Sequence, residues 1–250
     1  MIAMMTMCSP EIPNMDRVYQ NPWKRSILTV VLLCLNACQC GASKNELTSK
    51  GTSSYQNVTG DDIEQDRAHW DQYYSKTEKY VFGREPAQIL IDNVDILPIG
   101  RVLDIAMGEG RNAVYLAKKG FIVDGVDLSE TALRKARRMA RENRVNVNFF
   151  NADLNHYTIP PDKYEVILNI DYLQRSLIPQ IKRGLKRGGV VVFENNTLDQ
   201  LQNPGSEGMR RDYLLKKGEL REAFSEFKVL FYEEKNDGKE AKAKLVAMKP

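Results

Sequence analysis

Cysteine is missing from this 250-residue chain after residue 40, which excludes several kinds of site from the rest of it. A disulfide framework, a cysteine-ligated zinc ion and a catalytic thiol all need cysteines that this region does not have. Histidine is scarce too, because His69 and His156 are the only two and are not spaced like metal ligands, so we expect no metal site. The formal net charge is only +3, so nothing in the overall charge points to nucleic acid or to an acidic substrate.

What is present suits one sizeable domain with an extension at its front. The chain is 42% hydrophobic and 28% charged, and it contains no internal repeat. Residues 39–63 are rich in Ser, Thr, Asn and Gly and lack apolar periodicity, so we interpret them as a flexible linker. We therefore predict a single domain at residues 64–250.

Residues 1–38 are similar to a targeting segment. Lys24 and Arg25 precede the ten-residue apolar run SILTVVLLCL, which is too short to span a bilayer but suits a signal-peptide core. The run ends in Leu-Asn-Ala-Cys, which resembles the lipobox of bacterial lipoproteins. We expect lipidation at Cys38 and attachment to a membrane. A start at Met15 would shorten the leader that precedes the apolar run. The alternatives to lipidation are a short buried helix or an uncleaved anchor, and without membrane attachment we expect a cytoplasmic protein.

The predicted domain alternates strands with helices. Apolar strands are predicted at 101–107, 121–127, 147–153, 164–170 and 190–195. Helices are predicted at 112–119, at 130–143 with Ser129 as its cap, and at 176–189. Two last strands, 228–234 and 243–249, flank Asn236-Asp237-Gly238 as an antiparallel hairpin. The fold class is therefore α/β, a doubly wound, mostly parallel seven-stranded sheet with the hairpin at one edge.

A glycine turn follows the first of these strands. Gly108 to Ala113 satisfies G-x-G-x-x-G/A, and Asp127 lies 19 residues after Gly108, which is the spacing of a dinucleotide fingerprint. Asp104 argues against a pyrophosphate, because it would repel phosphate at the start of the following helix. S-adenosylmethionine (SAM) has no phosphate and carries an ammonium and a sulfonium, which an acid near the glycines suits.

Three acidic residues lie at the ends of three successive predicted strands, and they match the three polar parts of SAM. Asp104 can face the cation, Asp127 can accept the ribose hydroxyls, and Asp153 can accept the adenine amino group. Each acid alone could equally be a helix cap or a turn former. Their joint placement favours a binding site. The basic run from Arg134 to Arg144 is most simply a solvated helix face, with an anion site as the alternative.

From about Trp70 to Pro250 the chain resembles the class I SAM-dependent methyltransferases, and within them the bacterial tellurite-resistance (TehB-like) family. The most specific stretches are GEGRNAVYLA, with VDGVDLSE after it, and YLQRSL before the fifth strand. HWDQYY and YVFGREP resemble the lead-in that covers the cofactor. The sequence departs from the family at Met107, where cysteine is common, and at Asp171, where an aromatic is common. These departures concern the acceptor pocket.

The resemblance implies SAM as cofactor and assigns residues to it. Asp104, Gly108 and Gly110 would line the methionine end, with Asn112 beside them. Asp127 and Leu128 would hold the ribose and flank the adenine. Asp153 and Leu154 would hold the adenine edge, and Asn169 would lie near the transferable methyl group.

The predicted reaction is in-line transfer of the SAM methyl group to a small acceptor, such as a chalcogen oxyanion or a thiol. The sulfonium is already activated, so we assign no catalytic residue and expect the protein mainly to align donor and acceptor. Positional candidates for the acceptor rim are Tyr74, Tyr172, Arg175 and Asn195. We expect no nucleic-acid partner. The alternatives are an NAD-dependent oxidoreductase, or an exported non-catalytic protein with this fold, since SAM is made in the cytosol.

Overall fold

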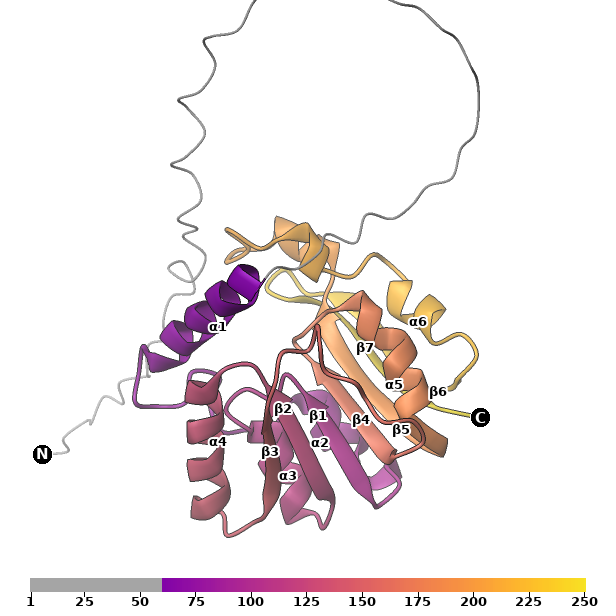
Figure 1. Ribbon diagram of the computed structural model, residues 1–250. Coiled ribbons are helices and arrows are strands. Elements are labelled where there is room, and N and C mark those ends of the chain that lie inside the picture. The colour runs from indigo at the N-terminus through magenta and orange to yellow at the C-terminus, as the bar shows by residue number, and fades with distance from the viewer. Residues whose placement is uncertain (1–59) are drawn as a thin grey trace, which may run out of the picture. The chain divides into compact units, whose positions relative to one another are not determined.

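The computed structural model describes residues 60–250 (Figure 1). The lipobox-like segment with Cys38, and the linker up to residue 59, lie outside the described residues. The first described element is helix α1, Gly60–Ser75, which begins four residues before the predicted start of the domain at residue 64. None of the helices in the described range is long and apolar enough to cross a membrane.

A single seven-stranded sheet forms the centre of the fold, in the order β3-β2-β1-β4-β5-β7-β6. The first five strands are parallel, and β7 pairs antiparallel with both β5 and β6. The strands are β1 Arg101–Ile105, β2 Ile122–Asp127, β3 Val147–Asn151, β4 Tyr164–Ile170, β5 Leu185–Asn196, β6 Lys228–Asn236 and β7 Ala241–Met248. The predicted mixed sheet with its C-terminal hairpin is confirmed.

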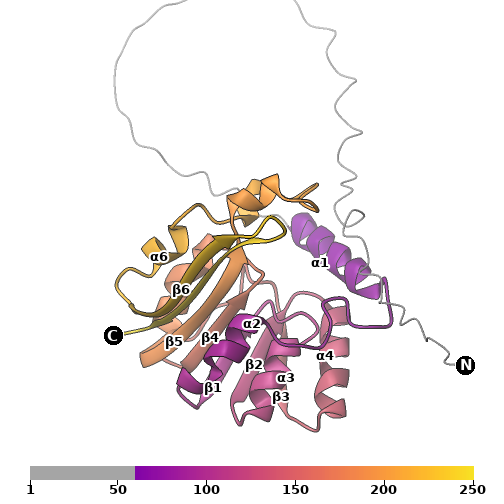
Figure 2. The same cartoon turned by 180° about the vertical axis from the view of Figure 1, so that it is seen from behind.

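Helices cover both faces of the sheet, as Figures 1 and 2 show from opposite sides. Apolar side chains of α2, α3 and α4 pack on one face, and those of α5 and α6 pack on the other. The helices are α2 Gln88–Asn93, α3 Arg111–Lys118, α4 Glu130–Glu142, α5 Ile178–Gly184 and α6 Glu219–Ala223. Short 3-10 turns are η3 Val94–Ile96, η4 Arg175–Leu177, η5 Leu198–Gln202 and η6 Arg211–Tyr213.

Strand ends at β1 and in the hairpin differ from the predicted ones by up to two residues, and two further predicted boundaries were wrong in ways that matter for the fold. The helix expected over 176–189 is α5, which ends at Gly184, and Leu185 already begins β5. Leu185 pairs with Tyr164 of β4, so sheet pairing overrides the helical pattern of the residues that follow. Strand β3 ends at Asn151, so Asp153 lies in the loop after the strand and not at its last position.

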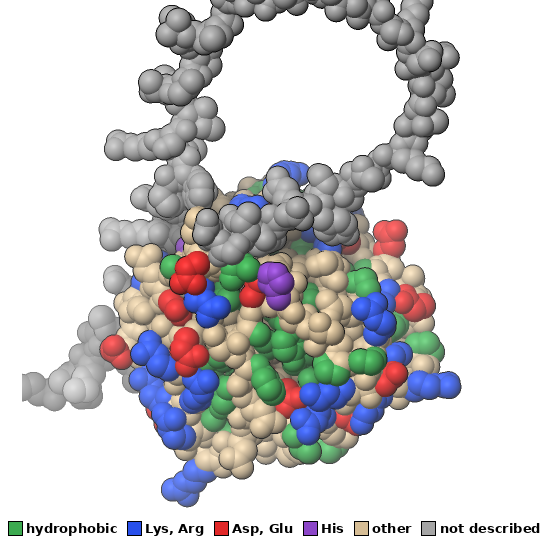
Figure 3. Space-filling view, viewed as in Figure 1, with side chains coloured by type: hydrophobic (Ala, Val, Ile, Leu, Met, Phe, Trp, Pro, Cys, Tyr) green, Lys and Arg blue, Asp and Glu red, His purple; other side chains and the backbone are tan. Residues whose placement is uncertain are grey.

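The basic run on α4 is only partly a solvated face. Figure 3 shows Lys and Arg side chains over this helix, and Arg134 and Arg141 are exposed. Lys135 is different, because it is buried and paired with Glu109. The predicted cap is confirmed, since Ser129 Oγ accepts the backbone N–H of Ala132 at 3.0 Å.

Asp124 is a buried carboxylate that joins four neighbouring strands on the α5 side of the sheet. Only 1% of its side chain is exposed. Asp124 lies on β2 and accepts three hydrogen bonds, one from each of three other strands. The donors are Arg101 Nη1 on β1 (3.0 Å), Asn148 Nδ2 on β3 (2.8 Å) and Tyr164 Oη on β4 (3.2 Å). Lys163 Nζ lies 3.2 Å from its Oδ2. Burial would raise the pKa of Asp124, but these hydrogen bonds outweigh it and lower that pKa.

Candidate functional site

The glycine turn lies at the carboxyl edge of the sheet, where β1 pairs with β2 on one side and with β4 on the other. In an open α/β sheet this reversal of strand order is where ligands bind. Gly108 and Gly110 have φ of 55° and 85°, a left-handed backbone that side chains with a Cβ rarely adopt. A Cβ on Gly108 would also lie 2.9 Å from Tyr74 Oη. Both glycines are therefore required by the backbone of the turn.

Asp127 holds the turn against the start of α4. Its Oδ2 accepts the Gly108 N–H and its Oδ1 accepts the Ser129 N–H, both at 2.8 Å. Burial raises the pKa of this carboxyl to about 6, although the two backbone hydrogen bonds favour its ionised form. The predicted acid at the end of β2 is thus in place, with one backbone donor on each oxygen.

Asp104 on β1 and Asn169 on β4 each present a buried oxygen without a hydrogen-bond partner. Both side chains are 1% exposed. Within the part of the chain that the structure describes, Asp104 Oδ2 and Asn169 Oδ1 are the two buried side-chain atoms left unpaired. Unpaired buried oxygens are rare in native proteins, because each loses its hydration without compensation. Burial raises the pKa of Asp104 to about 7, against the influence of nearby Arg111.

The other predicted cofactor residues are placed less directly. Asp153 Oδ1 accepts two hydrogen bonds from Asn155, one from the backbone N–H and one from Nδ2, both at 3.0 Å. Asp153 Oδ2 lies 2.7 Å from His156 Nδ1. Leu128 is half-buried next to Asp127, while the side chain of Leu154 packs in the core under α5. The roles predicted for these three residues at the adenine stay predictions.

Helix α1 spans the ends of β2 and β3. Asp71 Oδ1 accepts from Ser129 Oγ (2.5 Å) and from the Thr131 N–H (3.0 Å), so it fastens α1 to the start of α4. Arg67 Nη1 donates to Asn151 Oδ1 at 3.0 Å. Tyr74 is buried over Gly108, and burial together with Asp127 raises the pKa of its hydroxyl well above the ordinary value. The lead-in predicted to cover the cofactor therefore does lie over the turn.

The remaining rim candidates lie at the ends of β4 and β5. Arg175 has a structural role, because its guanidinium donates four hydrogen bonds within the protein. The acceptors are Glu219 Oε1 and Oε2 (2.5 and 2.9 Å) and the carbonyl oxygens of Asp212 and Leu214. Asn195 Nδ2 donates to the Tyr213 carbonyl at 2.8 Å. These contacts hold η6 and Leu214, the residue after it, in place.

Tyr172 packs against the core beneath that rim, and its Oη donates to Gln174 Oε1 at 2.7 Å. Burial, then Tyr213, Asp153 and Asp127, raise the pKa of its hydroxyl far above the ordinary value. A proton-accepting role for this tyrosine near neutral pH is therefore disfavoured. This leaves the rim without an evident general base among these four candidates.

Asp171 follows β4 with φ of 58°, a left-handed conformation that aspartate tolerates better than most residues. Its Oδ2 lies 3.1 Å from Arg111 Nη2 and its Oδ1 lies 3.0 Å from Lys242 Nζ. Lys242 also contacts Glu194 Oε1 at 2.9 Å. Asp171, which stands where the family commonly has an aromatic residue, is thus paired in an ion-pair network beside the turn.

Sequence patterns did not reveal which side chains tie this site together. Asp71 has no motif of its own, because its partners are 58 and 60 residues away. Glu109 lies between the two glycines of the motif, at a position where the motif accepts any residue, so the motif predicts no role for it. Asn112 was expected at the cofactor, but its Oδ1 accepts the Ala87 N–H at 2.9 Å. A direct cofactor contact of this side chain stays a prediction.

Comparisons with known proteins give consistent matches. Residues 102–189 match a family described as a methyltransferase domain. A Geobacillus sp. (strain WCH70) protein designated a methyltransferase is 31% identical over 134 residues, which are 50% of this chain and 49% of that protein. The ubiquinone biosynthesis O-methyltransferase of Coxiella burnetii is 30% identical over 91 residues, 36% of this chain and 38% of that enzyme. The chain thus spans about half or less of the length of these curated relatives.

Solved structures show the same fold. TehB from Haemophilus influenzae superposes with a TM-score of 0.58 at 22% identity, covering 72% of this chain and 67% of TehB. Magnesium protoporphyrin IX methyltransferase from Synechocystis PCC 6803, solved with bound SAM, gives 0.55 at 16% identity and covers 78% of this chain and 100% of that enzyme. At these identities the likeness establishes the fold, and it confirms the predicted Rossmann-like architecture.

Proposed function

Because this chain carries a class I methyltransferase domain and is similar to the TehB-like methyltransferases, we propose that it binds SAM and transfers its methyl group to a small acceptor. One observation carries the proposal: Asp104 Oδ2 and Asn169 Oδ1 are buried and unpaired beside the glycine turn. A cationic ligand with N–H donors would satisfy both oxygens. SAM offers an ammonium and a sulfonium, whereas the pyrophosphate of a dinucleotide would lie against a carboxylate.

The residues present fit this cofactor in their chemistry. Asp127 has a lone pair left on each oxygen after its two backbone contacts, which suits two ribose hydroxyls. Gly108 and Gly110 give the turn its left-handed backbone, and Tyr74 on α1 would exclude water from the methionine end. When bound, SAM supplies an activated methyl group on its sulfonium.

The chain's part in the reaction is alignment. An acceptor lone pair forms the new bond to the methyl carbon as the carbon–sulfur bond breaks and its electrons remain on sulfur, which leaves S-adenosylhomocysteine. A soft anion needs no general base, so we propose a chalcogen oxyanion or a thiolate as acceptor. A groove of about 340 Å³ beside the turn, lined by Arg84, Arg111 and Lys242 among others, supports an acceptor of small size.

Calorimetric titration of the full chain with SAM, S-adenosylhomocysteine and NADH tests the cofactor. We expect micromolar binding of the first two ligands and no binding of NADH. Binding of NADH alone would replace the methyltransferase proposal by an oxidoreductase. Binding of none of the three would indicate a fold that has lost its cofactor.

Replacing Asp127 by alanine should weaken SAM binding by about 1 to 3 kcal/mol, because charge-assisted hydrogen bonds to the ribose are lost. The variant also removes the acceptor of the Gly108 N–H, so its fold should be checked by circular dichroism. Asp92→Ala, an exposed carboxylate on α2, is the matched control and should bind SAM like the wild type. An unchanged SAM affinity in Asp127→Ala would remove this residue from the site.

We also propose attachment of the protein to a membrane through a lipid on Cys38. The lipobox-like sequence that ends in Cys38, after the apolar run, supports this proposal. Cys38→Ala should move the protein from the membrane fraction to the soluble fraction of its native host. Mass spectrometry that finds an unprocessed N-terminus in the membrane-bound protein would overturn the proposal.

A further inference from the structure

The segment between α1 and α2, residues 76–87, is held against the glycine turn by three residues of the turn and α3. We refer to this segment as the strap. Glu109 Oε2 accepts the Phe82 N–H at 3.2 Å, Arg111 Nη1 donates to the Phe82 carbonyl at 3.4 Å, and Asn112 Oδ1 accepts the Ala87 N–H at 2.9 Å. The strap therefore lies against the turn and the first residues of α3.

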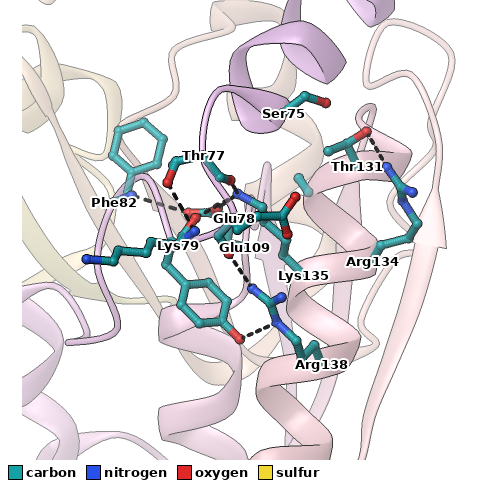
Figure 4. A network of polar contacts seen from close by, with 12 residues as sticks. Ser75, Thr77, Glu78, Lys79, Phe82, Glu109, Thr131, Arg134, Lys135 and Arg138 are labelled. Carbon is teal, nitrogen blue, oxygen red and sulfur yellow. Dashed lines mark hydrogen bonds and ion pairs between the residues drawn. The ribbon is translucent and has the colours of Figure 1, made fainter.

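A single ammonium group joins the strap, the turn and α4. Lys135 Nζ donates to the carbonyl oxygens of Thr77 and Lys79, each at 2.8 Å, and to Glu109 Oε1 at 2.9 Å. These three acceptors use all three hydrogens of the ammonium. Figure 4 shows Lys135 and Glu109 pointing toward each other beneath the strap. Their side chains are 10% and 2% exposed.

Arg138, one turn along α4, holds the outer side of the same strap. Its Nη2 donates to the Glu78 carbonyl at 2.9 Å, and its Nε donates to Tyr80 Oη at 3.3 Å (Figure 4). This side chain is more exposed than Lys135, so its contacts compete with water. The Lys135 contacts are therefore the stronger link between the strap and α4.

A buried ion pair is a weak stabiliser, because removing both charges from water offsets most of their attraction. Its distinctive effect is geometric, since a saturated Lys135 accepts only one arrangement of Thr77, Lys79 and Glu109. The strap continues directly from Tyr74, whose hydroxyl lies over Gly108. Tyr74 lies two residues before the strap, so moving the strap away from α4 would loosen the contact of Tyr74 with Gly108, although Asp71 keeps α1 attached to α4.

We propose that Lys135 and Glu109 are positioning residues for the cofactor site. They hold the strap closed on the glycine turn, so that opening of the strap and release of the cofactor are one event. The inference rests on the proposed SAM-binding function. It assigns a role to a lysine that belongs by sequence to a run of surface cations.

Three variants separate positioning from stability. Lys135→Met leaves Glu109 buried without its cation, and should both lower the stability of the fold and speed cofactor release. Glu109→Gln keeps an acceptor for the Phe82 N–H but removes the charge. The double variant Glu109→Gln with Lys135→Met removes both charges, so its stability should return close to the wild type while the strap still lacks its contacts with the ammonium of residue 135.

Three quantities are measured for each variant. The release rate is followed with labelled S-adenosylhomocysteine that is chased with unlabelled ligand. Amide hydrogen exchange of residues 76–84 reports opening of the strap, and urea unfolding reports the stability of the fold. In the double variant we expect release about tenfold faster than in the wild type, with faster exchange in the strap. Release that returns to the wild-type rate along with stability would overturn the inference. If the variants with Met at 135 do not fold, Glu109→Gln decides: unchanged release in that folded variant contradicts the proposal.

A matched control is the Glu165–Lys186 pair at the other end of the sheet, where β4 and β5 begin. Removing both charges there, by Glu165→Gln with Lys186→Met, should leave ligand release unchanged. Faster release in this control would show a general loosening and overturn the specific role of Lys135. A wild type that binds neither SAM nor S-adenosylhomocysteine would overturn the proposed function, and this inference with it.

Discussion

Asp104→Asn should weaken SAM binding about 30- to 100-fold while making the ligand-free protein more stable, because asparagine keeps the shape and removes the buried charge. The lost affinity reflects the absence of a carboxylate facing the cation. The gain in stability reflects the end of an unfavourable burial, since Asp104 Oδ2 has no partner in the folded chain. Calorimetry measures the first effect and urea unfolding measures the second.

The pH dependence of stability has a definite sign at this residue. The pKa of Asp104 is raised from 3.8 to about 7, so the folded state binds a proton that the unfolded state has lost. The stability due to this proton is full below about pH 4 and disappears as the pH rises through 7, by up to about 1.4 kcal/mol per pH unit. Asp104→Asn should lack this loss, so its advantage over the wild type should grow from pH 4 to pH 7.

SAM binding should show the opposite dependence on pH. The cation favours ionised Asp104, so the wild type should release a proton on binding at pH 6, and its affinity should fall as the pH is lowered below 7. Calorimetry in two buffers of different ionisation enthalpy counts the released protons. Asp127 also titrates near 6, so Asp104→Asn should reduce the proton release without abolishing it. Equal affinity and equal proton release in wild type and Asp104→Asn would remove Asp104 from the cation site; Asp92→Asn is the matched control.

Asp124→Ala should lower the free energy of unfolding by about 2 to 4 kcal/mol, because it removes the common partner of four side chains on adjacent strands. Tyr164 is fully buried and would lose its acceptor, and this accounts for most of the loss, whereas Asn148 is exposed and can be hydrated instead. Arg101 and Lys163 contribute less, since both reach solvent and can be hydrated. Urea unfolding at pH 7 measures the change in midpoint.

The Asp124 effect should fade in acid. Its pKa is lowered in the folded state, so its contribution is full above the ordinary value of 3.8 and is lost as the pH falls through the lower folded value. The difference between wild type and Asp124→Ala should therefore be constant above about pH 5 and shrink below pH 4. Asp92→Ala should stay within about 0.5 kcal/mol of the wild type. A similarly small change in Asp124→Ala would show that the cluster does not stabilise the sheet.

Much of the fold could be predicted because its signals are local. Apolar runs of five to seven residues marked the parallel strands, and Asn236-Asp237-Gly238 marked the hairpin. The boundaries that failed were those set by pairing with a distant strand. Leu185 looked helical from its neighbours, and its place in β5 comes from its pairing with Tyr164 on β4.

The candidate site divides in the same way. The sequence by itself determined that a glycine turn follows β1 and that acids stand at or near successive strand ends, because the spacing of parallel strands brings those positions to one edge. Only the tertiary structure decided that Asp104 is left unpaired, that Asp153 has local partners, and that Lys135 is buried under the strap. The burial of a side chain and its hydrogen-bond partners depend on residues that are far apart in the sequence, so a local pattern of residue types does not predict them.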